Sequence, residues 1–131
     1  MILLLLACMA TDGSRRKTDT STADTAAVPD DLTLWIAPTL SEHCTACHSG
    51  EAPASQLDLS GDLRAALVDA RSVQVDGVLV TPGDRFASYL WLKLEGQQAL
   101  VDGYGTVMPP GGQLDTELRD RIGGWIDAGA Q

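Results

Sequence analysis

The sequence predicts a small all-α domain, and three observations lead to that prediction. The chain has 131 residues, which is room for one domain. Apolar residues recur at helical spacing in the segments 32–40, 86–94 and 118–126. Capping residues or glycines border these segments, and no alternation of strands and helices surrounds the cysteine motif described below.

The first predicted helix leads directly into Cys44. Residues at i, i+3, i+4, i+7 and i+8 share one face, namely Leu32, Trp35, Ile36, Thr39 and Leu40. Pro38 interrupts this run, and proline is tolerated in a first helical turn but kinks a helix interior. We therefore expect either a bent helix or one that begins near Pro38 after a shorter turn.

Two short elements are expected next along the chain. Ser60 is a suitable N-cap for a second helix that ends near Leu67. The segment 73–83 is β-branched around Asp76 and Gly77, and this pattern predicts a small β-hairpin. An isolated hairpin is marginally stable unless it packs on another element.

Two longer helices complete the prediction. The segment 83–96 has Asp84 as N-cap and Gly96 as its C-terminal stop. Its aromatic and apolar residues, Phe86, Tyr89, Leu90, Trp91 and Leu94, are expected to pack in the core. The last helix is predicted over residues 116–128, capped by Asp115 or Thr116. Its apolar face consists of Leu118, Ile122, Trp125 and Ile126.

The stretch "EHCTACHSG" (42–50) holds the side chains that carry chemistry. Close cysteine pairs occur in zinc sites, in thioredoxin-like redox pairs and in C-x-x-C-H haem attachment. A structural zinc needs four ligands. Beyond Cys44, Cys47 and His48, the chain offers only the adjacent His43 and the distant Cys8. A redox pair would need a βαβ setting, which the surrounding pattern does not have.

Covalent haem attachment accounts for Cys44, Cys47 and His48 together. Each thiol forms a thioether with one vinyl group, and the imidazole reaches the iron as proximal ligand. The second axial ligand of such a haem is commonly Met or His. Of the three methionines, Met1 and Met9 belong to the N-terminal leader, which leaves Met108 in "VMPPGG". The following prolines restrict the loop and so reduce the entropy that Met108 loses on binding iron.

The segments "PTLSEHCTACHSG", "LDLSG", "VTPGDRFASYLWLKLEG", "VMPPGG" and "LRDRIGGWIDAGA" together resemble a bacterial class I c-type cytochrome, over residues 31–131. The resemblance implies a cytochrome c-like fold of four or five short helices around one covalent haem c. It implies thioethers at Cys44 and Cys47, with His48 and Met108 as axial ligands. Arg85, Trp91 and Tyr104 are candidates for holding the haem propionates, because they lie on the stretch that leads to the methionine loop.

The same resemblance bears on the glycine pair in the last helix. Gly123 and Gly124 lie in mid-helix, where each glycine costs roughly 1 kcal/mol relative to alanine. In class I cytochromes the first and last helices cross closely. One of these glycines is therefore expected to lie at that crossing, with simple tolerance of both as the alternative.

A haem with two protein axial ligands has no open site for a substrate, so electron transfer is expected and catalysis is not. The iron would cycle between Fe(III) and Fe(II) with His/Met ligation. Two alternatives stay open. One is an accessory subunit or domain of a larger redox enzyme, and the other is a haem sensor in which Met108 can be displaced.

The N-terminus predicts attachment to a membrane. Residues 1–8 end in Leu5, Leu6, Ala7 and Cys8, which resembles the lipobox of bacterial lipoproteins, whose cysteine is lipidated. A basic n-region is missing and the apolar run is short, which a true start upstream of Met1 would explain; a short disordered apolar terminus is the alternative. Residues 9–30 have the composition of a flexible tether. Met9, rather than Asp, after Cys8 favours the outer membrane.

The net charge of residues 31–131 bears on the expected binding partners. Residues 31–131 carry 14 acidic and 6 basic side chains, a net charge of −8. Nucleic acid would repel such a domain, whereas a redox donor or acceptor with a basic docking face would attract it. We therefore expect a lipid-anchored protein on the periplasmic side of a bacterial membrane.

Overall fold

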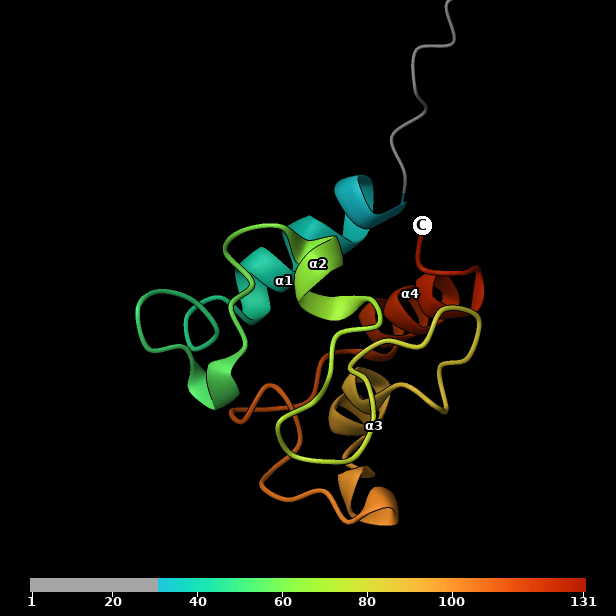
Figure 1. Ribbon diagram of the computed structural model, residues 1–131. Helices are drawn as coiled ribbons and strands as arrows, with labels where there is room; N and C mark the ends of the chain where they lie inside the picture. The colour runs from blue at the N-terminus through green and yellow to red at the C-terminus, as the bar shows by residue number, and fades with distance from the viewer. Residues whose placement is uncertain (1–30) are drawn as a thin grey trace, which may run out of the picture.

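The computed structural model describes residues 31–131, which form an all-α domain (Figure 1). Its α-helices are α1 (Ala37–His43), α2 (Leu63–Leu67), α3 (Tyr89–Glu95) and α4 (Thr116–Asp127). Three shorter helical turns accompany them, namely η1 (Leu32–Ile36), η2 (Ala54–Gln56) and η3 (Gln98–Val101). No strand occurs in this described part, so the all-α prediction is confirmed for it. The predicted leader and tether, residues 1–30, lie outside the described residues.

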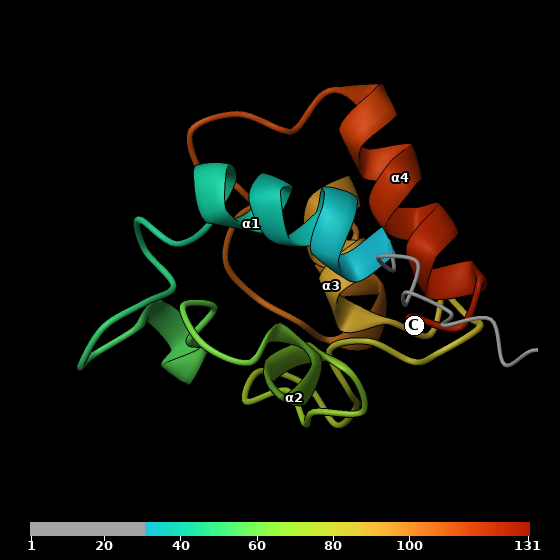
Figure 2. The ribbon, with the colours of Figure 1, turned by 90° about the horizontal axis from the view of Figure 1, so that it is seen from above.

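Figure 2 shows η1 and α1 forming one rod that passes beside α4, with α3 packed beneath them. The start of the described chain and its C-terminus lie close together in both views (Figures 1 and 2). Side chains from all four α-helices and from η1 build one core; its most buried members include Ile36, Leu40, Leu67, Leu94, Ile122 and Ile126.

No helix among residues 31–131 is long and apolar enough to cross a membrane.

Pro38 divides the first helix, as the sequence predicts. Because proline has no N–H, the bond to the carbonyl of Leu34 cannot form. The N–H of Ala37 bonds instead to the carbonyl of Leu32, which makes η1 a wide π-type turn. Regular helix then begins at Ala37 with Pro38 in its first turn. Leu32, Ile36 and Leu40 are buried as expected.

Trp35, by contrast, lies at the surface of the rod with half of its area exposed. The guanidinium of Arg121 covers its ring at 4.5 Å from the centroid. The π-type turn has more residues per turn than an α-helix, so residues at α-helical spacing do not all share one face. The α-helical periodicity therefore predicts burial correctly for Leu32 and Ile36 but not for Trp35.

The segment 68–84 contains no hairpin, so that prediction was wrong. Only isolated bridges occur there, such as Arg71 with Val78. The carbonyls of Val78 and Leu79 accept hydrogen bonds from the N–H groups of Tyr89 and Leu90, at 3.1 and 2.9 Å. These are the first, otherwise unpaired, N–H groups of α3, so the segment pairs with a helix start rather than with a strand.

The same contacts explain why α3 begins four residues later than predicted, with Ser88 rather than Asp84 before its first residue. Asp84 caps a local turn, accepting from the N–H groups of Phe86 and Ala87, rather than the helix. The hydroxyl of buried Ser88 accepts from the N–H of Thr81 and donates to the carbonyl of Asp84. Phe86 therefore lies in the turn and is exposed, contrary to its predicted core position.

The start of α2 also differs from the prediction in its capping residue. Asp62, not Ser60, is the N-cap, and its carboxylate accepts from the N–H of Ala65 at 3.1 Å. Ser60 instead donates to the carboxylate of Asp58 through both its N–H and its hydroxyl. Ser60 is therefore occupied by a local turn with Asp58, and the cap falls two residues later, at Asp62.

The last helix follows its prediction. Asp115 caps α4, with its carboxylate accepting from the N–H of Leu118 at 2.8 Å. Ile122, Trp125 and Ile126 are buried. Gly123 does lie at a close approach, but its neighbours are Arg85 and Trp91 rather than the first helix.

We expect Gly123→Ala to destabilise the protein by about 1–3 kcal/mol, since an added methyl group would overlap the Arg85 guanidinium and the Trp91 ring. Gly124 is the matched control, because no atom lies within 4 Å of an added methyl group there. Gly124→Ala should stabilise the helix by up to roughly 1 kcal/mol. Chemical denaturation of both variants measures the two effects, and equal effects would contradict this packing.

Candidate functional site

The C-x-x-C-H motif forms one further turn after α1. The N–H groups of Cys47 and His48 both bond to the carbonyl of Cys44, at 3.2 and 2.9 Å. The N–H of Cys44 in turn bonds to the carbonyl of Leu40, so the motif continues the helix that the sequence predicts. The two thiols and the imidazole are thus presented by one compact turn whose position is set by α1.

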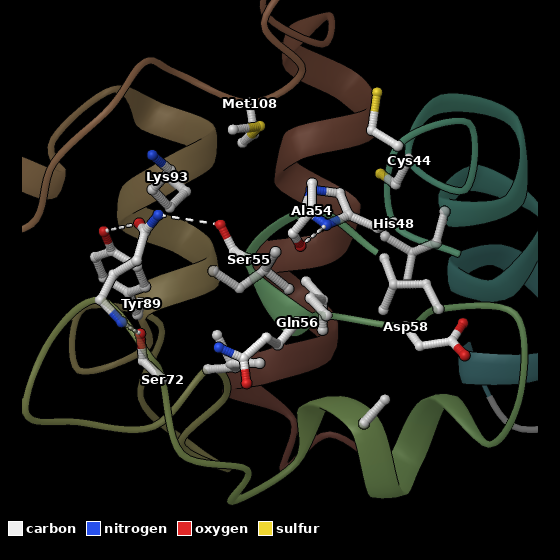
Figure 3. Close-up of a pocket in the computed structure, with 18 of the residues that line it drawn as sticks. Cys44, His48, Ala54, Ser55, Gln56, Asp58, Ser72, Tyr89, Lys93 and Met108 are labelled. Carbon is white, nitrogen blue, oxygen red and sulfur yellow. Dashed lines mark hydrogen bonds between the residues drawn. The ribbon is translucent and has the colours of Figure 1, made fainter. Parts of the chain in front are cut away.

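The ring of His48 is held in one orientation. Its Nδ1 lies 2.9 Å from the carbonyl oxygen of Ala54 (Figure 3). Because a carbonyl only accepts hydrogen bonds, Nδ1 is the donor in this contact, and Nε2 is the ring nitrogen that remains available to a ligand. The same arrangement of a backbone carbonyl behind a histidine is how proteins commonly orient a metal-binding imidazole.

The loop that carries Met108 is fastened to the end of α3. The N–H of Met108 bonds to the carbonyl of Lys93 at 2.9 Å, and the side-chain amide of Gln113 donates to the carbonyl of Leu94 at 2.8 Å. The last carbonyls of a helix have no partner within the helix. Here the methionine loop supplies those partners, and Gly96 in the left-handed conformation ends α3 as predicted.

All four residues singled out from the sequence, Cys44, Cys47, His48 and Met108, line one cavity. Its volume is about 570 Å³, within the range of sites for small molecules and cofactors. Figure 3 shows His48 and Met108 entering the cavity from different segments of the chain. Apolar side chains form much of the wall, among them Leu40, Leu57, Leu59, Leu79, Leu90 and Leu94.

Both thiols of the motif are free. Burial, and secondarily the neighbouring Cys47, raises the pKa of the Cys44 thiol to about 11. Redox-active cysteine pairs instead have a lowered pKa, because the thiolate is the reacting form. Among residues 31–131 no group of three or more His, Cys, Asp or Glu side chains is arranged to hold a metal ion.

His43 also lines the cavity, next to the motif. It borders a second hollow of about 370 Å³, which Pro109 of the methionine loop borders as well. Its Nε2 lies 3.9 Å from the carboxylate of Glu42. No backbone carbonyl holds this ring in the way that Ala54 holds His48.

The three predicted propionate-holding residues do not reach the cavity. Arg85 pairs with Asp127 at 2.7 Å and lies over the ring of Trp91, which is buried in the core. Although partial burial opposes ionisation of Asp127, hydrogen bonds from Arg85 keep its pKa below the usual value. Tyr104 is mostly exposed and does not line the cavity.

Polar residues that the sequence did not single out line the cavity instead. They include Ser55, Arg71, Gln74, Tyr89 and Lys93. Burial lowers the pKa of Lys93. A lysine within an apolar helical segment was the one available signal, because such a residue is costly to bury without a partner.

Comparison with known protein families, with curated proteins and with solved structures finds no match for this chain.

Proposed function

We propose that this protein is a monohaem c-type electron carrier, with haem covalently bound through Cys44 and Cys47. The observation that carries the proposal is the convergence of two thiols, one oriented imidazole and one thioether on a single apolar cavity. His48 and Met108 are 60 positions apart in the sequence, yet both line it. This donor set matches haem c chemistry, in which His and Met are a common axial pair.

Each chain residue has a defined task in this proposal. The bound haem supplies one-electron Fe(III)/Fe(II) cycling. Cys44 and Cys47 fix it to the chain, and His48 offers Nε2 because Ala54 holds the proton at Nδ1. Met108 would offer its thioether sulfur to the iron, and a thioether ligand would favour the ferrous state. The apolar wall excludes water and so limits reorganisation during electron transfer.

The sequence also supports two further proposals, one on the redox partner and one on the attachment of the protein to a membrane. The net charge of −8 over residues 31–131 favours a redox partner with a basic docking face. A lipid at Cys8 would hold the protein at the periplasmic side of a membrane, with residues 9–30 as the tether.

Removing both motif thiols tests the attachment. A Cys44→Ala/Cys47→Ala variant, produced with a c-haem assembly system, should release all of its haem into acidified acetone, because no thioether remains. Wild type and the matched control Cys8→Ala should keep haem on the polypeptide, as measured by denaturing mass spectrometry. Haem that resists extraction in the double variant, or that is never attached in wild type, would overturn the proposal.

Two alternative functions use the same cavity; carbon monoxide binding separates the sensor from the carrier, and copurification separates the accessory subunit. In a carrier both axial positions are filled, so the reduced protein should not bind carbon monoxide. A haem sensor with a displaceable Met108 should bind it readily. An accessory subunit of a larger redox enzyme would behave as the carrier does but would copurify with a catalytic partner.

A further inference from the structure

Lys93 is a buried cation with no carboxylate beside it. The residue is 7% exposed and lines the cavity. Its ammonium donates to the carbonyl of Tyr104 at 3.0 Å, and no described carboxylate lies within ion-pair distance. An ammonium has three donors, and lysines this buried are almost always paired. Two donors and one charge are therefore left without a protein partner.

Other cations of the described chain do have carboxylate partners, unlike Lys93. Four arginines of the described chain each have a carboxylate partner, in the pairs Arg71–Asp76, Arg85–Asp127, Arg119–Glu95 and Arg121–Glu117. Acidic residues outnumber basic ones 14 to 6 in this part of the sequence. Partners for a lysine are therefore plentiful in composition, yet none lies next to Lys93.

Polar side chains form part of the cavity wall on the side of Lys93. The Tyr89 hydroxyl donates to the side-chain oxygen of Gln74 at 2.7 Å, and the Gln74 amide donates to the hydroxyl of Ser55 at 3.2 Å. Figure 3 shows Tyr89 on the same side of the cavity as Lys93, whereas Asp58 lies on the opposite side. An anionic group of an occupant would be repelled by Asp58 and attracted to the lysine side.

We propose that Lys93 is the electrostatic partner of a carboxylate of the bound cofactor. This proposal rests on the function proposed above, in which the cofactor is haem and the group is one of its carboxylates. The charge of Lys93 is then compensated by the cofactor rather than by the protein. Because the carbonyl of the same residue accepts from the N–H of Met108, Lys93 also links the carboxylate side of the cavity to the methionine loop.

Infrared spectroscopy of protein matured with haem ¹³C-labelled at its carboxyl groups tests this pairing. Lys93→Gln keeps a donor for the Tyr104 carbonyl but removes the charge, and Lys93→Arg restores the charge. Arg121→Gln is the control, since it removes a cation that does not line the cavity. We expect the labelled carboxylate bands to shift in Lys93→Gln only. Unshifted bands in Lys93→Gln, or an equal shift in Arg121→Gln, would overturn the inference.

The wild-type protein gives a second measurement if Lys93→Gln does not retain haem. A carbodiimide activates a carboxylate, and attack by an adjacent amine forms an amide with net loss of one water. Mass spectrometry of the digest should find the haem peptide joined to the peptide that contains Lys93. Its absence would then overturn the inference. Covalent haem without this link leaves the electron-carrier proposal standing, whereas wild type without covalent haem removes both.

Discussion

Replacing His48 by alanine is expected to abolish the low-spin c-type spectrum of the loaded protein, whereas His43→Ala should leave that spectrum unchanged. Both imidazoles line the cavity, so position alone does not separate them. Orientation does. The carbonyl of Ala54 holds Nδ1 of His48 at 2.9 Å, which directs the lone pair of Nε2 away from the backbone.

His43 has no equivalent support. Its Nε2 is 3.9 Å from the Glu42 carboxylate, and no backbone carbonyl of the described residues holds its ring as Ala54 holds that of His48. Optical and electron paramagnetic resonance spectra of the two variants measure the difference. A normal spectrum in His48→Ala, or a lost spectrum in His43→Ala, would reassign the proximal ligand.

The sequence was most informative where local chemistry decides the structure. Asp115 caps α4 because its carboxylate reaches the N–H of Leu118, three residues away. Gly96 ends α3 because the left-handed conformation suits glycine. Pro38 interrupts the first helix because it lacks an N–H. The four candidate ligands line one cavity, and their binding of haem there stays a prediction.

Predictions failed where distant segments compete for the same backbone groups. Val78 and Leu79 direct their carbonyls to the start of α3, which replaces the predicted hairpin and moves the helix start to Tyr89. Phe86 then lies in an exposed turn. No local pattern encodes these contacts, because the partners are about ten residues apart and belong to different elements.

The polar wall of the cavity escaped prediction for the same reason. Arg85 looked like a propionate ligand because of its place in the sequence, but the fold directs it to Asp127 and Trp91. Lys93 looked like an ordinary helix lysine, yet α3 turns it toward the cavity. Which cation faces a cavity depends on how a helix is rotated in the fold, and capping signals do not fix that rotation.

Replacing Met108 by alanine should remove the sixth ligand of the iron without removing the haem. The methionine loop is tied to α3 through the carbonyls of Lys93 and Leu94, and Pro109 and Pro110 restrict its backbone. In the proposed haem protein, these restraints would hold a weak thioether ligand in place. The smaller side chain leaves the loop fastened but the axial position open, so the reduction potential should fall and carbon monoxide should bind the reduced variant.

The visible and far-red spectrum of the oxidised protein, recorded beside that of Met108→Ala, tests the central claim most directly. We expect a c-type spectrum in both proteins and a sulfur-to-iron charge-transfer band in the far red that is present only in wild type. Covalent haem whose far-red band is missing, or unchanged by the substitution, would contradict His48/Met108 ligation and the electron-carrier function that depends on it.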